Sequence, residues 1–334
     1  MLPAEAEELH ALCAARRMLG GEVKQLSGVV GRGRNSRVYR VVDGRGTDFA
    51  LKTYLRQADD PRDRLGAEFG GLRFLWLNGV RNVPEAVAVD ARDGAALYGW
   101  LDGQPIAQPG AGDIDAAVAF LARLRDLSWL PEAARLPPAA EACLSGAEIL
   151  RQVAGRRDRL AAIEDASLQR FLAARFDPLA ALAAERAAVS GNGFEAVLAG
   201  EYRTLSPSDF GFHNALRARG GVVIFLDFEY FGWDDPVKLV ADFLLHPGMT
   251  LPSELAARFR QGAEAVYGGE GDYARRLDRH LPLFALRWAL IALNEFLPQR
   301  QVRRRFAGLP AVDADLLAGQ LALAGRILQG VAQA

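Results

Sequence analysis

The sequence has little of what marks secreted, membrane-bound or nucleic-acid-binding proteins. Its 334 residues include only two cysteines, Cys13 and Cys143, too few for a disulfide scaffold and without the spacing of a zinc site. The 40 basic and 41 acidic residues give a formal net charge of −1, which removes any chain-wide attraction to nucleic acid. The N-terminal segment has three Glu before its first Arg and no apolar run before a cleavage site, so no secretory leader is expected.

Long apolar runs are also absent. The most apolar stretch, LPLFALRWALIALNEFL, is interrupted by Arg287 and Glu295 and is short for a bilayer span of about 20 residues. A buried amphipathic helix explains it better. With 50% hydrophobic and 24% charged residues the chain can bury an ordinary core. Together these features predict a cytoplasmic protein with no nucleic-acid or membrane partner, and they leave its oligomeric state open.

Two regions of different character follow each other along the chain. After a helix expected near 4–18, three strand-like segments lie before residue 60, a helix is expected over about 61–77, and two more strands follow before about 100. Beyond a Gly- and Pro-rich connection at 102–112 the pattern becomes mostly helical. We expect helices near 145–161, 166–189, 236–246, 252–266, 281–297 and 313–331. The pattern predicts an α+β chain with a small antiparallel sheet in 1–102 and a larger, mainly helical part in 103–334.

The first candidate site is a turn between two predicted strands, in which Gly31 and Gly33 let backbone N–H groups approach phosphate oxygens. Alone it is more typical of a solvated hairpin turn. In the next strand, Ala50 and Lys52 point to the same face, so a small residue can floor a purine site beside an ammonium group. Glu68, in the predicted helix, is in a position to pair with Lys52, although a surface glutamate is the commoner role.

A more specific cluster lies in the second region. Asp209 and Asn214 stand five residues apart in SDFGFHN, and Asp227 follows the apolar segment VVIFL. A hairpin between them returns the second carboxylate to the first. The three side chains then provide oxygen ligands for Mg²⁺ and one spare base. Asx turns explain Asn214 by itself, but not the turn, lysine and glutamate that precede the cluster in matching order.

In this order of motifs the sequence resembles the aminoglycoside phosphotransferase and choline kinase-like family, which is related to the protein kinases. The segment Gly31-x-Gly33-x-x-Ser36-x-Val38 is similar to the kinase glycine-rich loop, and Ala50-Leu51-Lys52 to the end of its lysine strand. Pro207-Ser208-Asp209 with Asn214 resembles the catalytic loop, and Asp227-Phe228-Glu229 the metal-binding motif. The resemblance implies a bilobal protein kinase-like fold, with a nucleotide-binding lobe over 1–102 and a catalytic, substrate-binding lobe over 103–334.

The resemblance also implies roles for these residues in an ATP- and Mg²⁺-dependent small-molecule kinase, with GTP as an alternative donor. Lys52, held by Glu68, contacts the α and β phosphates, and Asn214 with Asp227 binds Mg²⁺. Asp209 is the catalytic base for an acceptor hydroxyl. Nucleotide contacts are assigned to Gly31, Gly33, Ser36, Val38, Ala50, Lys52, Tyr98 and Trp100.

One departure from the family pattern leaves an alternative open. Pro207 stands where the family has the histidine that braces the catalytic loop, which either lowers activity or shifts the brace to another residue. A catalytically weak or inactive nucleotide-binding regulator is therefore the alternative. We favour an active enzyme, because Asp209, Asn214 and Asp227 are all present.

The acceptor is poorly encoded in the sequence. The resemblance directs attention to a late helix whose candidate substrate residues are Arg287, Trp288, Asn294 and Glu295, although core and surface roles explain them equally well. Residues 281–309 carry five Arg and one Glu, which favours a neutral or anionic acceptor over a polycationic aminoglycoside if these charges line the pocket. A sugar, sugar-like molecule or amino alcohol is the expected class.

Overall fold

The computed structural model describes residues 4–29, 35–55, 60–189, 194–269, 271–306 and 309–333. Its N-terminal part is a five-stranded antiparallel sheet with the strand order β1-β2-β3-β5-β4. A helix precedes the sheet and another follows its third strand. The elements are α1 Ala4–Leu19, β1 Val23–Val29, β2 Ser36–Asp43, β3 Asp48–Tyr54, α2 Arg64–Leu77, β4 Ala86–Asp90 and β5 Ala95–Gly99. The expected order of three strands, a helix and two strands is confirmed.

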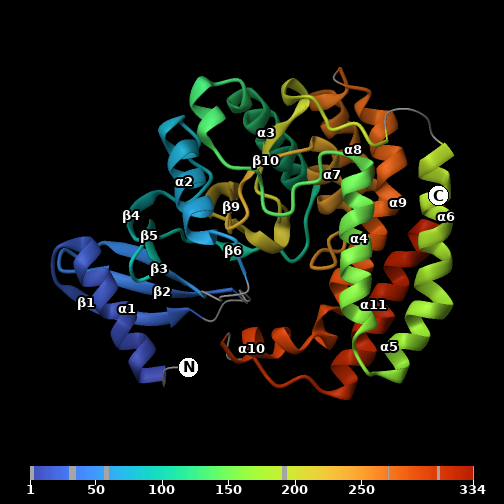
Figure 1. The fold of residues 1–334 in the computed structure, drawn as a ribbon. Helices are drawn as coiled ribbons and strands as arrows, with labels where there is room; N and C mark the ends of the chain where they lie inside the picture. Colours follow the sequence, from blue (N-terminus) through green and yellow to red (C-terminus); the bar gives the residue numbers. More distant parts are fainter. Residues whose placement is uncertain are drawn as a thin grey trace.

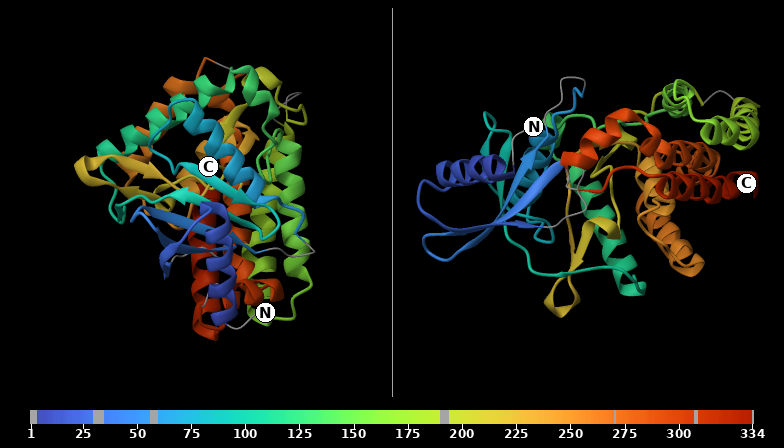
Figure 2. Two further views of the ribbon diagram at one scale, coloured as in Figure 1. Left: turned by 90° about the vertical axis from the view of Figure 1, so that its left-hand side faces the viewer. Right: turned by 90° about the horizontal axis from the view of Figure 1, so that it is seen from below.

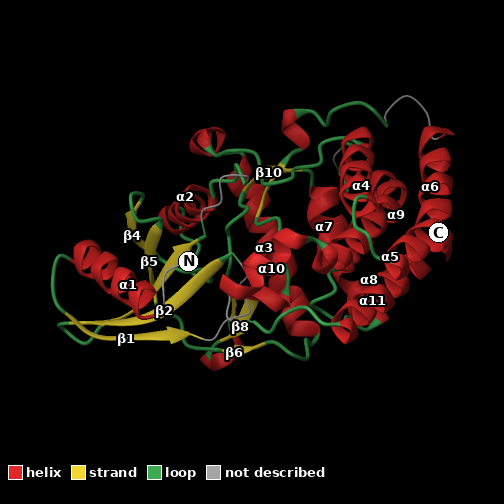
Figure 3. Cartoon of the chain, turned by 60° about the horizontal axis from the view of Figure 1, so that its bottom comes forward, coloured by secondary structure: helices red, strands yellow, loops and turns green. Residues whose placement is uncertain are grey.

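The remainder of the described chain is mainly helical, with two small sheets near the middle (Figures 1 and 3). The short strands are β6 Gln104–Pro105, β7 Thr204–Ser206, β8 Ala215–Arg217, β9 Val223–Phe225 and β10 Gly232–Asp234. The helices are α3 Ala111–Ser128, α4 Gly146–Ala161, α5 Ala166–Phe171, α6 Asp177–Val189, α7 Pro236–Leu245, α8 Ser253–Tyr267, α9 Tyr273–Ala292, α10 Pro298–Phe306 and α11 Ala314–Gln333. A π-helical stretch, Leu172–Phe176, joins α5 to α6, and short 3₁₀ turns occupy Pro131–Arg135, Gly200–Tyr202, Phe212–Asn214, Arg219–Gly221 and Leu293–Phe296.

The two faces of the N-terminal sheet belong to different cores. Leu51 and Leu97 face α1 and form a small cluster with Tyr39 and Val41. Tyr98 faces the other way, into the large core that continues through the helical part. Because side chains alternate along a strand, Lys52 shares this second face and points toward the helical part of the molecule.

Helix α9 is the centre of the helical part. It packs against α4, α7, α6 and α11, and its residues from Leu283 to Leu290 are buried. Figure 1 shows the long helices α4, α6, α9 and α11 side by side, at the opposite end of the molecule from the sheet. No single helix in the described ranges is long and apolar enough to cross a membrane; the bent pair Tyr273–Phe296 and Pro298–Phe306 passes that test by length and composition only.

Helix α10 was not expected from the sequence. It lies between the sheet and the long helices (Figures 1 and 2) and touches the sheet directly. The Arg37 side chain of β2 donates hydrogen bonds to the Phe306 carbonyl at 2.8 and 2.5 Å and lies over the Phe306 ring. Arg303 pairs with Asp60 at 3.1 Å, so two contacts join α10 to the N-terminal part.

Candidate functional site

A buried lysine connects the sheet to the helical part of the molecule. The Lys52 Nζ atom donates to Glu68 Oε2 of α2 and to Asp227 Oδ1, each at 2.7 Å. Lys52 and Glu68 are only 7% and 3% exposed. Glu68 also accepts from the Tyr54 hydroxyl at 2.8 Å and from the Phe228 N–H at 3.3 Å. The Lys52–Glu68 pairing expected from the sequence is therefore present, and it holds the ammonium beside Asp227.

The charges in this cluster depend on one another. Burial by itself lowers the pKa of Lys52, but the carboxylates of Asp227 and Glu68 outweigh it and raise that pKa well above its ordinary value. Burial raises the pKa of Glu68, and Lys52 opposes this rise. Lys52 therefore stays protonated in a largely buried site, where its charge interacts with other charges more strongly than in water.

The hairpin of β8 and β9 brings Asn214 and Asp227 together. Ala215 pairs with Phe225 in this hairpin, so the residues just outside it, Asn214 and Leu226, lie opposite each other. The Leu226 N–H donates to the Asn214 carbonyl at 2.8 Å. The Asn214 side chain donates its Nδ2 to the Asp209 carbonyl at 3.0 Å, which leaves the amide oxygen for another partner. Lys52 is thus bonded to Asp227, and Leu226, next to Asp227, is bonded to Asn214, which bonds in turn to Asp209.

The loop that carries Asp209 is fixed from behind by a buried ion cluster. The loop follows β7, and Ser208, which has a positive φ of 67°, donates to the Ala140 carbonyl at 3.3 Å. Lys238 of α7 donates to the Ser208 hydroxyl at 2.9 Å. The same ammonium is 2.9 Å from Asp234 and 3.0 Å from Asp242. The backbone on the N-terminal side of Asp209 is therefore anchored to the core.

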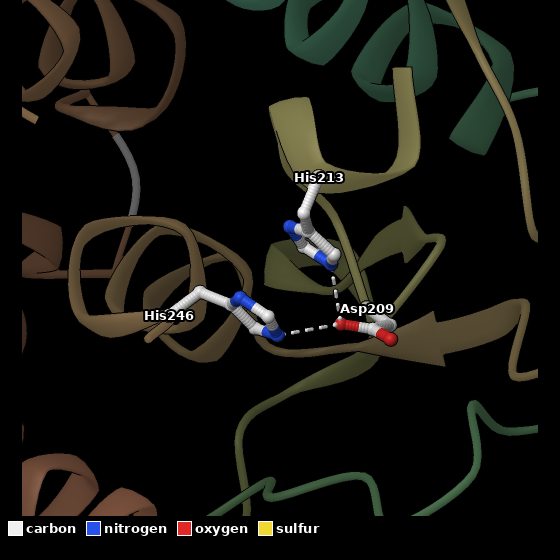
Figure 4. A group of neighbouring side chains, drawn as sticks. All are labelled: Asp209, His213 and His246. Atoms are coloured by element: carbon white, nitrogen blue, oxygen red, sulfur yellow. Dashed lines mark hydrogen bonds and ion pairs between the residues drawn. The ribbon is translucent and has the colours of Figure 1, made fainter. Parts of the chain in front are cut away.

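Two histidine side chains contact the Asp209 carboxylate. His213 lies in the 3₁₀ turn of the same loop, and His246 follows α7 directly (Figure 4). Their Nε2 atoms are 3.0 and 3.2 Å from the same oxygen, Asp209 Oδ1. Burial would raise the pKa of Asp209, but hydrogen bonds from His213 and His246 outweigh it and hold that pKa well below its ordinary range. The Asp209 side chain is 32% exposed, so its ionised carboxylate is partly accessible to solvent.

The residues expected to contact the nucleotide are only partly described. Gly31 and Gly33 fall outside the described residues. Ser36 and Val38 lie at the start of β2, where Val38 pairs in register with Lys52, and Ala50 pairs with Tyr98. The Tyr98 hydroxyl forms a 2.8 Å hydrogen bond with the Tyr54 hydroxyl, which also bonds to Glu68. The Trp100 indole donates to Asp102 at 2.9 Å, and the Arg40 guanidinium lies over the Trp100 ring. Contact of these residues with a nucleotide stays a prediction.

Two of the four residues expected to contact the acceptor bond to Asp242, in the ion cluster behind the catalytic loop. Arg287 is 4% exposed and bonds to Asp242 at 3.2 Å and to Glu141 at 3.0 Å. The Trp288 indole donates to Asp242 at 2.8 Å, and its ring meets His246 edge-on. Glu295 is buried, and Asn294, next to it, is partly buried. Acceptor contact by these four residues stays a prediction.

Most of the arginines in residues 281–309 pair with acidic side chains. Arg300 and Arg304 both pair with Glu295 at 3.3 Å, Arg303 pairs with Asp60, and Arg287 pairs with two carboxylates. Four of the five arginines in residues 281–309 therefore have acidic partners. Three of these acids are shared with further cations, so the charge preference of the acceptor stays a prediction.

His213, His246 and Lys238 were not identified as site residues from the sequence. The chain has only four histidines, and His213 stands inside the catalytic-loop motif itself, one residue before Asn214. The four-residue spacing of Asp234, Lys238 and Asp242 was also visible in the sequence, with the last two on one face of α7 and Asp234 just before it. Nothing in the sequence indicates that His246 reaches Asp209, because that contact depends on how α7 packs.

Comparison with known proteins agrees with this geometry. Residues 29–279 match the model of the phosphotransferase enzyme family. The choline kinase LicA from Streptococcus pneumoniae superposes with a TM-score of 0.60 and 14% identity, over 98% of this chain and 99% of that one. The spectinomycin phosphotransferase APH(9)-Ia, solved with ADP and spectinomycin, has a TM-score of 0.62 and 10% identity over 93% and 95% of the two chains. An ethanolamine kinase from Plasmodium vivax has a TM-score of 0.57 and 13% identity, over 93% and 83%.

No curated protein matches the sequence closely enough to count as a relative. The solved structures share the bilobal architecture, with an antiparallel sheet followed by a helical part, and at these identities they establish the fold. The family model covers most of the chain, including the lysine strand, the catalytic loop and the Asp227 motif. The chain therefore belongs to the phosphotransferase enzyme family.

Proposed function

We propose that this enzyme transfers the γ-phosphate of ATP, with Mg²⁺, to a hydroxyl group of a small molecule. The observation that carries the proposal is the convergence of Lys52, Asp227, Asn214 and Asp209, which three segments of the chain bring close together. Solved relatives support the nucleotide, since one was crystallised with ADP and others with AMP-PNP.

The donor set fits a magnesium ion. Asp227 offers a carboxylate that is 30% exposed, and Asn214 offers an amide oxygen oriented away from the Asp209 carbonyl. Both are hard oxygen ligands of the type that Mg²⁺ prefers. When bound, the ion would neutralise the charge that develops on the phosphates.

The side chains of the enzyme then divide the remaining work. Lys52 binds the α and β phosphates, and Glu68 keeps its ammonium extended toward them. Asp209 accepts the proton of the acceptor hydroxyl, while that oxygen forms a bond to the γ-phosphorus and the bond to the leaving ADP oxygen breaks. The low pKa of Asp209 keeps it ionised, so its main contribution is to orient the hydroxyl.

The acceptor class comes from the relatives. Their names give choline, ethanolamine and antibiotics as substrates, so we propose an amino alcohol, a sugar or a sugar-like molecule here. We further propose a cytoplasmic location, where ATP is available, and both cysteines are free thiols in the structure.

The test is phosphate transfer from Mg-ATP to a panel of choline, ethanolamine, aminoglycosides, spectinomycin and simple sugars. Asp209→Asn should lower turnover by about 10²- to 10⁴-fold while the Kd for ADP stays unchanged. EDTA should abolish transfer, and excess Mg²⁺ should restore it. Asp126→Asn, at an exposed position on α3, is the matched control.

The alternative of a nucleotide-binding regulator predicts a different result. In that case ADP binding would raise the melting temperature, but the wild type would transfer no phosphate to any acceptor and would not hydrolyse ATP. The histidine contacts to Asp209 favour the enzyme, because they fix the catalytic carboxylate although Pro207 cannot.

A further inference from the structure

His213 and His246 form an unusual arrangement around Asp209. Their rings are parallel, with centroids 3.6 Å apart and an angle of 3° between the planes. They come from different elements, yet their Nε2 atoms both point at Asp209 Oδ1 (Figure 4). The ring of His246 also makes a T-shaped contact with Trp288, with centroids 4.6 Å apart. The pair is thus built into the structure and is not a surface coincidence.

The hydrogen bonds of His246 determine where its proton lies. The Gly248 N–H donates to His246 Nδ1 at 3.0 Å, so Nδ1 acts as an acceptor and carries no hydrogen. A neutral imidazole has one N–H, which must then be on Nε2, facing Asp209. His213 Nδ1 is buried and has no partner within the described ranges, so a hydrogen placed there would be left unpaired. Both rings are therefore Nε2–H donors to the same carboxylate oxygen.

Two glycines make room for this pair. A Cβ atom on Gly211 would come within 2.7 Å of His213 Nδ1. A Cβ atom on Gly248 would come within 2.8 Å of His246 Cε1 and 3.2 Å of His213 Cβ. Any larger residue at either position would push an imidazole out of place, so the backbone around the cluster is shaped to fit both rings.

Two imidazoles and a carboxylate are also ligand types for a transition metal, and the three ligand atoms lie within 4.8 Å of one another. The geometry disfavours such a site. An Nε2 atom that carries a hydrogen has no lone pair for a metal, and His246 cannot move its hydrogen to Nδ1 without losing the bond from Gly248. Moreover, one ion cannot lie in the planes of two parallel rings that are stacked on each other.

We propose that His213 and His246 are positioning residues that lock the Asp209 carboxylate for catalysis, in place of the brace that Pro207 cannot supply. This inference rests on the proposed function of Asp209. With Oδ1 held by two N–H groups, the carboxylate cannot rotate, and no bond to Oδ2 is found in the described part of the chain. Oδ2 is then the atom that receives the hydroxyl proton, at a fixed place relative to the Mg²⁺ ligands.

The kinetic test separates positioning from binding. Replacing both histidines by alanine should lower kcat by about 10- to 100-fold for whichever acceptor of the panel is used, because a misplaced base loses alignment. The KM for ATP and the Kd for ADP should stay within threefold. His213→Gln and His246→Gln retain an N–H donor and should each recover part of the kcat that the alanine variant at the same position loses. His10→Ala, in the exposed face of α1, is the control.

A second measurement needs no activity. Long-range ¹H–¹⁵N spectra of the wild-type imidazoles should show His213 and His246 in the Nε2–H form, and Asp209→Asn should shift both. An Nδ1–H form of His246 would overturn the proposal, and so would stoichiometric Zn²⁺ binding that Asp209→Asn abolishes. The double alanine variant with wild-type kcat would refute the positioning role alone. If Asp209→Asn itself remained active, the proposed function would fail first.

Discussion

The ion cluster behind the catalytic loop allows a quantitative prediction. Lys238 is fully buried, and its ammonium lies 2.9 and 3.0 Å from the carboxylates of Asp234 and Asp242, whose side chains are at most 4% exposed. Two such pairs at an effective dielectric constant of about 20 attract by roughly 5 kcal/mol each. The desolvation of the ammonium offsets several kcal/mol of this attraction. Lys238→Met, which fills a similar volume, should therefore destabilise the protein by about 3–5 kcal/mol.

Urea unfolding followed by tryptophan fluorescence measures this loss. The chain has three lysines, at 24, 52 and 238, so Lys24→Met on the exposed side of β1 is a matched control and should change stability by less than about 0.5 kcal/mol. A loss below about 1 kcal/mol for Lys238→Met would refute the assumption that the two carboxylates depend on this ammonium.

The loss should also depend on pH in a defined direction. Burial raises the pKa of Asp234 and Lys238 opposes this rise, so without Lys238 the pKa of Asp234 in the folded state rises further above its unfolded value. The penalty is then complete at pH values above the folded pKa and shrinks as acid protonates Asp234. Comparison of the variant with the wild type at pH 7.5 and pH 5 should show the smaller difference at pH 5. An equal or larger difference at pH 5 would contradict the ion-pair explanation.

Two further predictions concern helices α2 and α7. Gly70→Ala should stabilise the protein by up to about 1 kcal/mol, since a Cβ there meets nothing within 4 Å, whereas Gly71→Ala should destabilise it, since its Cβ would lie 2.4 Å from the Phe231 ring. Thermal melts of the two variants check this, and equal shifts would refute it. Burial raises the pKa of Asp235 to about 6, although Arg276 opposes this rise. The folded protein therefore binds a proton at Asp235 more tightly than the unfolded chain does, and it loses stability as pH rises from about 4 to about 6. Asp235→Asn keeps a cap oxygen for the Val237 N–H and should flatten that dependence by on the order of 2–3 kcal/mol in urea titrations; an unchanged slope would contradict it.

Much of the fold followed from periodicity. The sheet strands and the helices of the second part were expected close to their observed positions, because each has an apolar face that fits its period. Helix α9 begins at Tyr273, earlier than the expected 281. Its first eight residues were missed because half of them are charged, which weakens the apolar pattern there. Helix α10, PQRQVRRRF, has almost no apolar face, and its arginines find partners only after folding brings Asp60 and Glu295 close.

In the candidate site, too, some residues could be predicted from the sequence and others could not. Lys52, Glu68, Asp209, Asn214 and Asp227 were predicted because their types and order form a motif. His246 was not found, since its contact with Asp209 is made by the packing of α7 against the catalytic loop and leaves no trace in local spacing. The Glu141 carboxylate, paired with Arg287 and Arg156 beside Ala140, was missed for the same reason.

The contacts of α10 with the sheet have a consequence for the way the enzyme opens. In a two-lobed enzyme with one connecting strand, the lobes can swing apart as if on a single hinge. Here side-chain contacts also join the two parts, among them Lys52 with Asp227 and Arg37 with the end of α10. The lobes are therefore held together by these contacts as well as by the connecting chain. If the lobes separate during turnover, either the Arg37–Phe306 hydrogen bonds break or α10 moves together with the sheet.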